Sequence, residues 1–240
     1  MRISAAILVF SLVSVTPALV MGTPIAQWTF ESTVPTTAGP YSPEVGSGSA
    51  SGFHAGAAVY SSSVGNGSAH SYSSTVWAVG DYWQFQVSTI GFENTSISWD
   101  QASSNTGPGV FGLFWSLTGV AGSFAQVGGN YGVLANASPN PLWNGTTSSS
   151  LYSYNYNLSL ITALNNASTV YFQLIDESTT SANGSTVAGG GTDRIDNFTV
   201  TGAQIPDSTS GLACLVCSVG LLEVLRRMTS VSSPLPQKHA

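Results

Sequence analysis

The chain has 240 residues, enough for one domain of ordinary size once its two ends are set aside. Only 7% of the residues are charged, against about 25% in typical soluble domains, and the formal net charge is −6. Arg194 is the only Lys or Arg between Gln27 and Gln204, so the clustered cations that neutralise phosphates are missing and nucleic-acid binding is excluded. Both cysteines, Cys214 and Cys217, fall in an apolar stretch near the C-terminus, which leaves the body without a disulfide or a thiol nucleophile.

Residues 1–22 have the pattern of a secretory signal peptide. Arg2 supplies the positive start, and the stretch 5–15 is apolar except for Ser11 and Ser14. Small residues follow, as a cleavage site requires. The apolar run is short for a membrane span of about 20 residues, so we expect this segment to direct export and then to be removed.

The body, residues 23–204, alternates between apolar and polar positions with a period of two and has no helical stripe. In the segment 82–89, Trp83 and Phe85 fall on one side and Gln84 falls on the other. The other strand-like segments, in chain order, are 25–31, 95–102, 111–117, 152–156, 170–174 and 195–200. Clusters of Gly, Ser, Asn and Pro between them have the composition of turns, and only 158–165 suggests a helical turn.

This spacing of strands without intervening helices predicts an all-β fold, an antiparallel β-sandwich. We expect a jelly-roll-like arrangement, because a jelly roll closes a core of this size from about eight strands. The sandwich would be flanked by the N-terminal signal helix and by a C-terminal transmembrane helix.

The C-terminal end carries the second targeting pattern, which consists of a short motif, an apolar stretch and two cations. These are Ile205, Pro206, Asp207 and Ser208, then residues 211–225, then Arg226 and Arg227. Cations directly after an apolar segment remain on the cytoplasmic side, so the segment 205–227 is predicted to hold a transmembrane helix, with 228–240 as a short polar tail.

The order of these parts resembles the VPDSG-type relative of the PEP-CTERM sorting signals. The resemblance implies an exosortase-type membrane enzyme as the partner that processes the protein during export. An unprocessed single-span anchor is the alternative. The body likewise resembles a family of exported proteins found with such tails, in the segments 26–31, 80–85, 98–101, 170–174 and 194–200. That second resemblance implies a jelly-roll-like secreted domain and brings no settled activity with it.

Two acids are candidate ligands of a structural calcium ion. Glu31 ends the first predicted strand, and Asp196 lies in the last one. Carbohydrate-binding jelly rolls often begin with a Phe-Glu strand and end with an Ile-Asp-Asn strand, and by that resemblance Glu31 and Asp196 would bind Ca²⁺. Two carboxylates with carbonyls and water would complete the roughly six to eight oxygens that calcium requires. The alternative is that Asp196 pairs with Arg194 or caps a turn.

Aromatic residues beside loops, together with three alternating tyrosines, are the candidates for binding a polysaccharide. Exposed rings offer a flat apolar face with a polar edge, which suits stacking on sugars in a neutral groove. The alternative is that these rings fill the ends of the sandwich. The candidates are Trp77, Tyr82, Tyr131, Trp143, Tyr152, Tyr154 and Tyr156.

Signals for catalysis are weak. A glycosidase needs two carboxylates that face each other across a cleft, and the sequence alone does not pair any. No G-x-S-x-G elbow supports a Ser-His-Asp set. We therefore expect a non-enzymatic exported protein of the cell envelope or extracellular matrix, with glycan binding as the hypothesis for its ligand. A polysaccharide-active enzyme, or the accessory carbohydrate-binding module of one, is the alternative, and a purely structural coat protein is a third.

Overall fold

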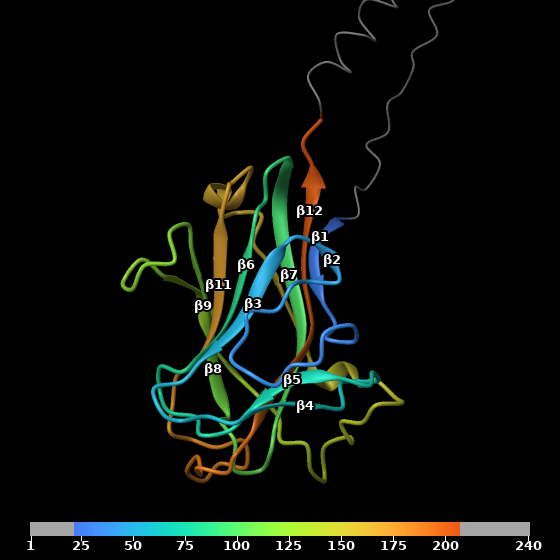
Figure 1. Ribbon diagram of the computed structural model, residues 1–240. Coiled ribbons are helices and arrows are strands. Elements are labelled where there is room, and N and C mark those ends of the chain that lie inside the picture. The colour runs from blue at the N-terminus through green and yellow to red at the C-terminus, as the bar shows by residue number, and fades with distance from the viewer. Residues whose placement is uncertain (1–21, 207–240) are drawn as a thin grey trace, which may run out of the picture.

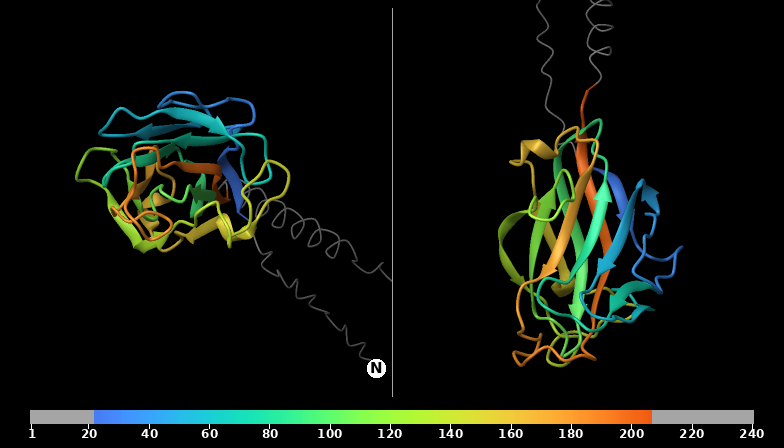
Figure 2. Two further views of the ribbon diagram at one scale, coloured as in Figure 1. Left: turned by 90° about the horizontal axis from the view of Figure 1, so that it is seen from below. Right: turned by 60° about the vertical axis from the view of Figure 1, so that its left-hand side comes forward.

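The structure, a computed structural model, describes residues 22–206. This part of the chain forms twelve strands, arranged as two antiparallel sheets that face each other (Figures 1 and 2). The predicted antiparallel β-sandwich is therefore confirmed, with more strands than the eight or so expected. The signal segment and the sorting segment lie outside the described residues, apart from Gly22, Ile205 and Pro206. Within 22–206, no helix is both long enough and apolar enough to span a bilayer.

The larger sheet, sheet A, has seven strands. They are β1 (Thr23–Trp28), β2 (Val45–Gly46), β4 (Tyr60–Ser63), β5 (Ser71–Ser74), β7 (Phe92–Ser103), β10 (Ser153–Asn157) and β12 (Asp193–Gln204). Five of them run in the order β10-β7-β12-β1-β2. Strand β12 pairs with β1 along its second half and with β5 along its first, and β4 adds to β5.

The smaller sheet, sheet B, has five strands in the order β3-β6-β11-β8-β9. They are β3 (Gly48–Phe53), β6 (Tyr82–Val87), β8 (Val110–Ser116), β9 (Ala125–Gly132) and β11 (Val170–Asp176). Two short 3₁₀ helices, η1 (Ser150–Tyr152) and η2 (Thr162–Leu164), lie in the connections. The second falls within the segment 158–165 for which the sequence suggested a helical turn.

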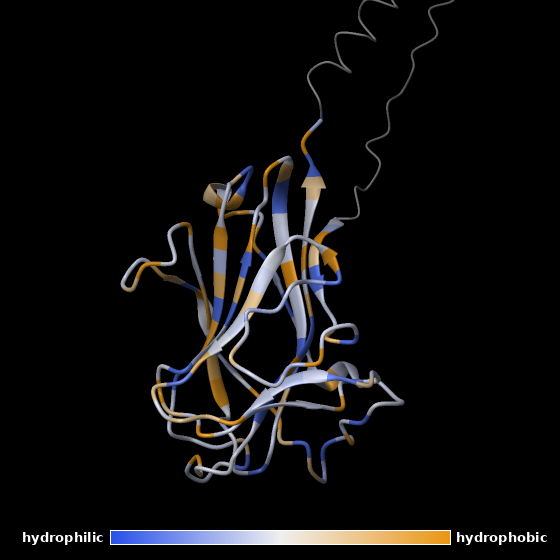
Figure 3. Ribbon diagram, viewed as in Figure 1, coloured by the Kyte–Doolittle hydropathy of each residue, from blue (hydrophilic) through white to orange (hydrophobic). Residues whose placement is uncertain are grey.

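The core between the sheets is rich in aromatic rings. Phe85 of sheet B lies parallel to Phe198 of sheet A, with ring centroids 3.6 Å apart, and Trp28 meets Phe85 edge-on at 5.2 Å. Apolar and polar positions alternate along β6 and β11, as the colouring in Figure 3 shows. Because a strand points successive side chains to opposite faces, the inward residues form the core and the outward ones are free for other roles.

The two ends of the described chain lie together. Thr23 pairs with Gly202 across β1 and β12, so Gly22 and Pro206 are at the same end of the sandwich (Figure 1). The long axis of the strands runs from this end to the loops at the opposite one. The outer faces of both sheets are consequently the sides of the molecule, parallel to that axis.

Candidate functional site

The outer face of sheet B gathers aromatic rings and side-chain amides, and we call it the aromatic–amide face. It is built by the outward positions of β3, β6, β8 and β11. Its members are Phe53, Tyr82, Gln84, Phe114, Tyr171, Gln173 and Ile175. The pairing register sets these side chains in rows across the sheet, so residues that are far apart in sequence become neighbours.

The first row contains a stacked pair of rings. Phe53 and Tyr82 are opposite each other on β3 and β6, with centroids 5.0 Å apart and planes inclined by 16°. Phe53 is 48% exposed, and Ile175 continues the row on β11. Partial burial raises the pKa of Tyr82 above its usual value, so its phenol is a neutral hydrogen-bonding group at physiological pH.

The second row contains two amides beside a ring. Nε2 of Gln173 donates to Oε1 of Gln84 at 2.8 Å, which fixes the orientation of both amides. Phe114 is paired with Gln173 on the other side, on β8. Since an amide has two N–H donors and an oxygen acceptor, Gln84, the more exposed of the two, retains hydrogen-bonding capacity after this bond, while Gln173 is 5% exposed. Rings that stack and amides that donate and accept are thus fixed on one rigid surface.

A pocket of about 520 Å³ opens on this face. Tyr82 and Phe114 line it from the sheet, and Phe124 lines it from the loop between β8 and β9. Gly119 of that loop has a φ of +69°, and a Cβ there would lie 2.8 Å from the ring of Tyr171, so only glycine allows the loop to approach the sheet this closely. Glu177 is the one carboxylate among the lining residues.

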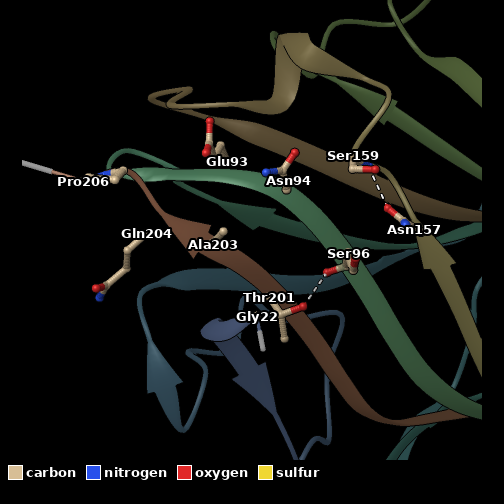
Figure 4. Close-up of a pocket in the computed structure, with 10 residues that line it drawn as sticks. All are labelled: Gly22, Glu93, Asn94, Ser96, Asn157, Ser159, Thr201, Ala203, Gln204 and Pro206. Atoms are coloured by element: carbon tan, nitrogen blue, oxygen red, sulfur yellow. Dashed lines mark hydrogen bonds between the residues drawn. The ribbon is translucent and has the colours of Figure 1, made fainter. Parts of the chain in front are cut away.

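A second pocket, of about 560 Å³, lies at the end of the sandwich that holds both Gly22 and Pro206 (Figure 4). Its lining is polar and includes Glu93 and Asn94, and it contains no aromatic ring. Thr201 donates to the carbonyl of Ser96 across the floor. This pocket offers hydrogen bonds without a surface on which a sugar ring could stack, so it is the weaker candidate.

Of the seven aromatic residues predicted from the sequence, Tyr82 lies on the aromatic–amide face. The expected exposure is wrong for Trp77, Trp143 and Tyr152, which are buried. Tyr152 also lies in η1 and not on the strand with the other two tyrosines. For these rings the alternative interpretation, that they fill the interior, describes the structure.

The remaining three candidates surround Trp99 on the inner side of sheet A. Tyr154 and Tyr156 stack on its indole at 5.5 Å and 5.7 Å, and Tyr131 meets it edge-on. The hydroxyl of Tyr131 donates to Oε1 of Gln101 at 2.8 Å, inside the sandwich. These rings are only partly buried, but the faces against Trp99 are already occupied.

Sequence reasoning missed most of the aromatic–amide face. The signal was present, since Tyr171 and Gln173 alternate with the buried residues Val170 and Phe172. Phe114 alternates with the inward residues Phe111 and Leu113 along β8, so its side chain points outward. Aromatic residues near loops were predicted as candidates, and those at outward strand positions, such as Phe114 and Tyr171, were not.

The two calcium candidates lie around one loop and serve as hydrogen-bond acceptors there. Asp196 is buried and accepts from the backbone N–H of Asn66 at 3.0 Å and from the hydroxyl of Ser68 at 2.7 Å. Its own neighbour Asn197 adds a backbone and a side-chain N–H. Glu31 accepts from the N–H of His70 at 2.7 Å.

This donor set does not fit a calcium ion, because N–H and O–H groups point at the carboxylate oxygens of Asp196 where oxygen ligands would have to converge on a cation. Within residues 22–206, no group of three or more His, Cys, Asp or Glu is placed to hold a metal. A Cβ on Gly65 would lie 2.2 Å from Oδ2 of Asp196, so the loop approaches the carboxylate through a glycine. Calcium binding stays a prediction from resemblance.

A serine, a histidine and an aspartate do form a hydrogen-bonded chain. Nε2 of His54 lies 2.9 Å from Oγ of Ser74, and Nδ1 of His54 lies 2.9 Å from Oδ2 of Asp81. The side chains of His54 and Asp81 are 1% exposed, and Ser74 is fully buried. Burial also lowers the pKa of His54, which favours the neutral imidazole. A substrate has no access to Ser74 in this arrangement, so the chain of hydrogen bonds is structural here.

Arg194, the only Lys or Arg of the body, makes no ion pair with the carboxylates of residues 22–206. Within residues 22–206 no carboxylate lies within salt-bridge distance of Arg194, and the one close contact between a basic and an acidic side chain joins the neutral His54 to Asp81. Burial lowers the pKa of Arg194, although the nearby charge of Asp193 opposes this shift. Of the two alternatives to calcium binding, the pairing of Asp196 with Arg194 is wrong, whereas the acceptance of hydrogen bonds from Asn66 and Ser68 agrees with a carboxylate that caps a turn.

Comparisons with known proteins give a loose likeness of fold. No family model and no curated protein matches the chain. The K2 cleaved adhesin domain of Lys-gingipain from Porphyromonas gingivalis is 16% identical, covers 73% of this chain and 97% of its own, and has a TM-score of 0.42. The CBM22-2 xylan-binding domain from Paenibacillus barcinonensis Xyn10C is 11% identical, covers 75% and 99%, and has a TM-score of 0.44. Likeness at this level transfers no residue, ligand or activity.

Proposed function

We propose that this chain is an exported, non-enzymatic protein of the cell surface whose β-sandwich binds a neutral glycan on the aromatic–amide face. The observation that carries the proposal is the grouping of outward rings and amides on sheet B around one pocket. Scattered exposed apolar residues are normal on any protein, whereas a cluster rimmed by polar groups is typical of a binding surface.

The chemistry of the face suits a sugar polymer. The stacked pair of Phe53 and Tyr82 and the ring of Phe114 offer apolar surface for the C–H faces of pyranose rings. The amide of Gln84 is half-buried and held in place by Gln173, which is itself only 5% exposed, so Gln84 offers the donors and acceptor for hydroxyls. With Glu177 as the only charged residue lining the pocket, a neutral polymer fits better than a highly charged one.

Export and sorting are part of the same proposal and rest on the sequence patterns at the two ends. We infer removal of residues 1–22, and processing by an exosortase or retention of the apolar segment as an anchor. Mass spectrometry of the mature surface protein tests this directly, because it locates both ends. Termini at Met1 and Ala240 would contradict signal removal and tail processing together.

Affinity electrophoresis of the described domain in gels containing neutral polysaccharides tests the glycan proposal. A panel of arabinoxylan, galactan and mixed-linkage β-glucan, with polygalacturonate as a charged comparison, spans the relevant chemistry. We expect retardation by at least one neutral polymer, and loss of it in Phe114→Ala. Asn155→Ala, an exposed polar position on the other sheet, is the matched control.

Two results would overturn the proposal. The first is migration unchanged by every polymer in the panel. The second is release of reducing ends from a retarding polymer, which would favour the polysaccharide-active enzyme. The two pockets at the aromatic–amide face and at the end with Gly22 and Pro206 are each lined by a single carboxylate, Glu177 or Glu93, whereas hydrolysis of a glycosidic bond ordinarily requires two.

A further inference from the structure

A separate pocket of about 280 Å³ lies at the end of sheet B where β11 finishes, between the segment 77–79 and the loop that joins β11 to β12. Trp77, Val79 and Val187 give it apolar walls. The hydroxyl-bearing residues that line it are Ser178, Thr179 and Thr186, and its one charged residue is Asp176. The size suits a ligand of about one six-membered ring, below the usual range for drug-sized molecules.

Asp176 is incompletely satisfied by the protein. The residue is 1% exposed, and its Oδ2 has no hydrogen-bond partner among the described residues. Its Oδ1 accepts only a long bond, 3.3 Å, from the backbone N–H of Ser178. A buried carboxylate oxygen without a donor is costly, and such groups in a native fold call for a specific explanation.

Other acidic side chains surround Asp176, so its environment carries negative charge. Asp81 from the segment before β6 and the adjacent Glu177 both raise its pKa, and Asp193 of β12 is also close enough to interact with it. His54 lies behind Asp81 and is engaged by it. Burial is the largest cause of the shift, which brings the pKa of Asp176 to about 7.

We propose that this pocket binds a primary ammonium group carried on a small ring, as in an amino sugar, with Oδ2 of Asp176 as the acceptor. A charged donor supplies both the missing hydrogen bond and the missing positive charge, whereas a neutral hydroxyl supplies only the first. A metal ion fits poorly, because a single carboxylate and a few hydroxyls fall short of the oxygen ligands that a hard cation requires.

The site is independent of the aromatic–amide face. Asp176 and Glu177 are consecutive, so they point to opposite sides of the chain and line different pockets. Ammonium binding and polysaccharide binding can therefore succeed or fail separately.

Two matched probes, trans-4-aminocyclohexanol and trans-1,4-cyclohexanediol, test the proposal. The first carries an ammonium group at the position where the second carries a hydroxyl. Titrated into ¹⁵N-labelled domain at pH 8, the amine should bind at least about tenfold more tightly than the diol. It should shift the amide resonance of Ser178 and the indole N–H of Trp77, which donates to the carbonyl of Ser74 at the edge of the pocket. At pH 5.5, where Asp176 is protonated, the preference for the amine should disappear.

Two variants localise the effect. Asp176→Asn keeps the size of the side chain and should abolish the preference, while retardation by polysaccharide stays as in the parent. Asn155→Ala, an exposed polar position on the outer side of sheet A, is the control and should leave amine binding unchanged. Equal affinity for the two probes, no shifts with either, or a preference that survives in Asp176→Asn or at pH 5.5 would each overturn the proposal.

Discussion

The outer faces of the two sheets obey the same alternation and carry different chemistry. A row across sheet A reads Asn155, Ser98, Thr199 and Gln27, all small or polar. The corresponding row across sheet B reads Ser51, Gln84, Gln173 and Phe114, and the next row adds the stacked rings of Phe53 and Tyr82. The fold requires apolar residues only at inward positions, so the rings on sheet B are not explained by folding. Outward aromatic residues are therefore the positions at which a binding role can be distinguished from a role in folding.

The largest effect should come from two neighbouring residues of β6 that point in opposite directions. Trp83 is fully buried, and its indole N–H donates to Asp193 at 2.7 Å. Trp83→Ala should lower the free energy of unfolding by about 3–5 kcal/mol, because it opens a cavity and leaves a buried carboxylate short of a donor. Urea unfolding measures this.

The outward neighbour gives the contrast. Tyr82→Ala should cost far less stability and should weaken polysaccharide binding about tenfold, close to 1.4 kcal/mol. If the two variants lose similar amounts of stability, or if Tyr82→Ala binds as the parent does, the division between inward and outward roles on this strand fails.

The next effect is a fall in stability as the pH rises, and it has sources on both sheets. Burial raises the pKa values of Asp176 on sheet B and of Asp193 and Asp196 on sheet A to about 7, from an unfolded value of 3.8. Between these two pKa values the folded state binds more protons than the unfolded state, so the free energy of unfolding should fall as the pH rises from about 4 to about 7 and then level off. Urea midpoints at pH 4.5, 6 and 8 would show it, and a midpoint that rises over this range would contradict it.

Asp196 and Asp176 form a third test, since one buried acid is fully bonded and the other is not. Asp196→Asn turns an N–H toward the donors of Asn66 and Ser68 and should cost about 1–3 kcal/mol. Asp176→Asn removes an unpartnered charge and should cost little or stabilise the protein at pH 8. Equal losses in the two variants at pH 8 would mean that hydrogen bonding does not distinguish the two sites.

The smallest effect is expected on the outer face of sheet A. Thr199→Ala, in the polar row, should change the free energy of unfolding by less than about 0.5 kcal/mol and leave migration in polysaccharide gels unaltered. Thermal unfolding and affinity electrophoresis together check it. A loss of retardation in Thr199→Ala would show that the glycan binds on sheet A and not on the aromatic–amide face of sheet B.

The sequence predicted what depends on local pattern. The period of two in β6 and β11 placed Trp83, Phe85 and Phe172 inside, and the lack of a helical stripe fixed the fold class. Contacts between distant segments lay beyond it. Nothing in the local pattern shows that the loop at Ser68 closes on Asp196, 128 residues later, or that His54 meets both Ser74 and Asp81.

The residues of the candidate site also fall into two groups, those that the local sequence pattern predicts and those that depend on strand pairing. Tyr82 was predicted because it lies beside a loop, whereas Phe53 becomes its partner only through the pairing of β3 with β6. For Tyr152, Tyr154 and Tyr156 the error was the opposite one, because they were predicted to be exposed and their rings pack against the protein. Alternation correctly placed Tyr154 and Tyr156 on one side of β10, but whether that side faces water or Trp99 depends on which sheet the strand joins and in what register.

The meeting of Gly22 and Pro206 at one end of the sandwich affects how a surface-held copy would encounter its ligand. If the segment after Pro206 is retained as the proposed anchor, the long axis of the strands would lead away from the point of attachment and the aromatic–amide face would lie along the side of the molecule. Such a face is best placed to contact material in the same layer, such as polymers that run between neighbouring molecules. If both the proposed anchor and the proposed glycan site hold, the protein would be placed to link polymers along the surface.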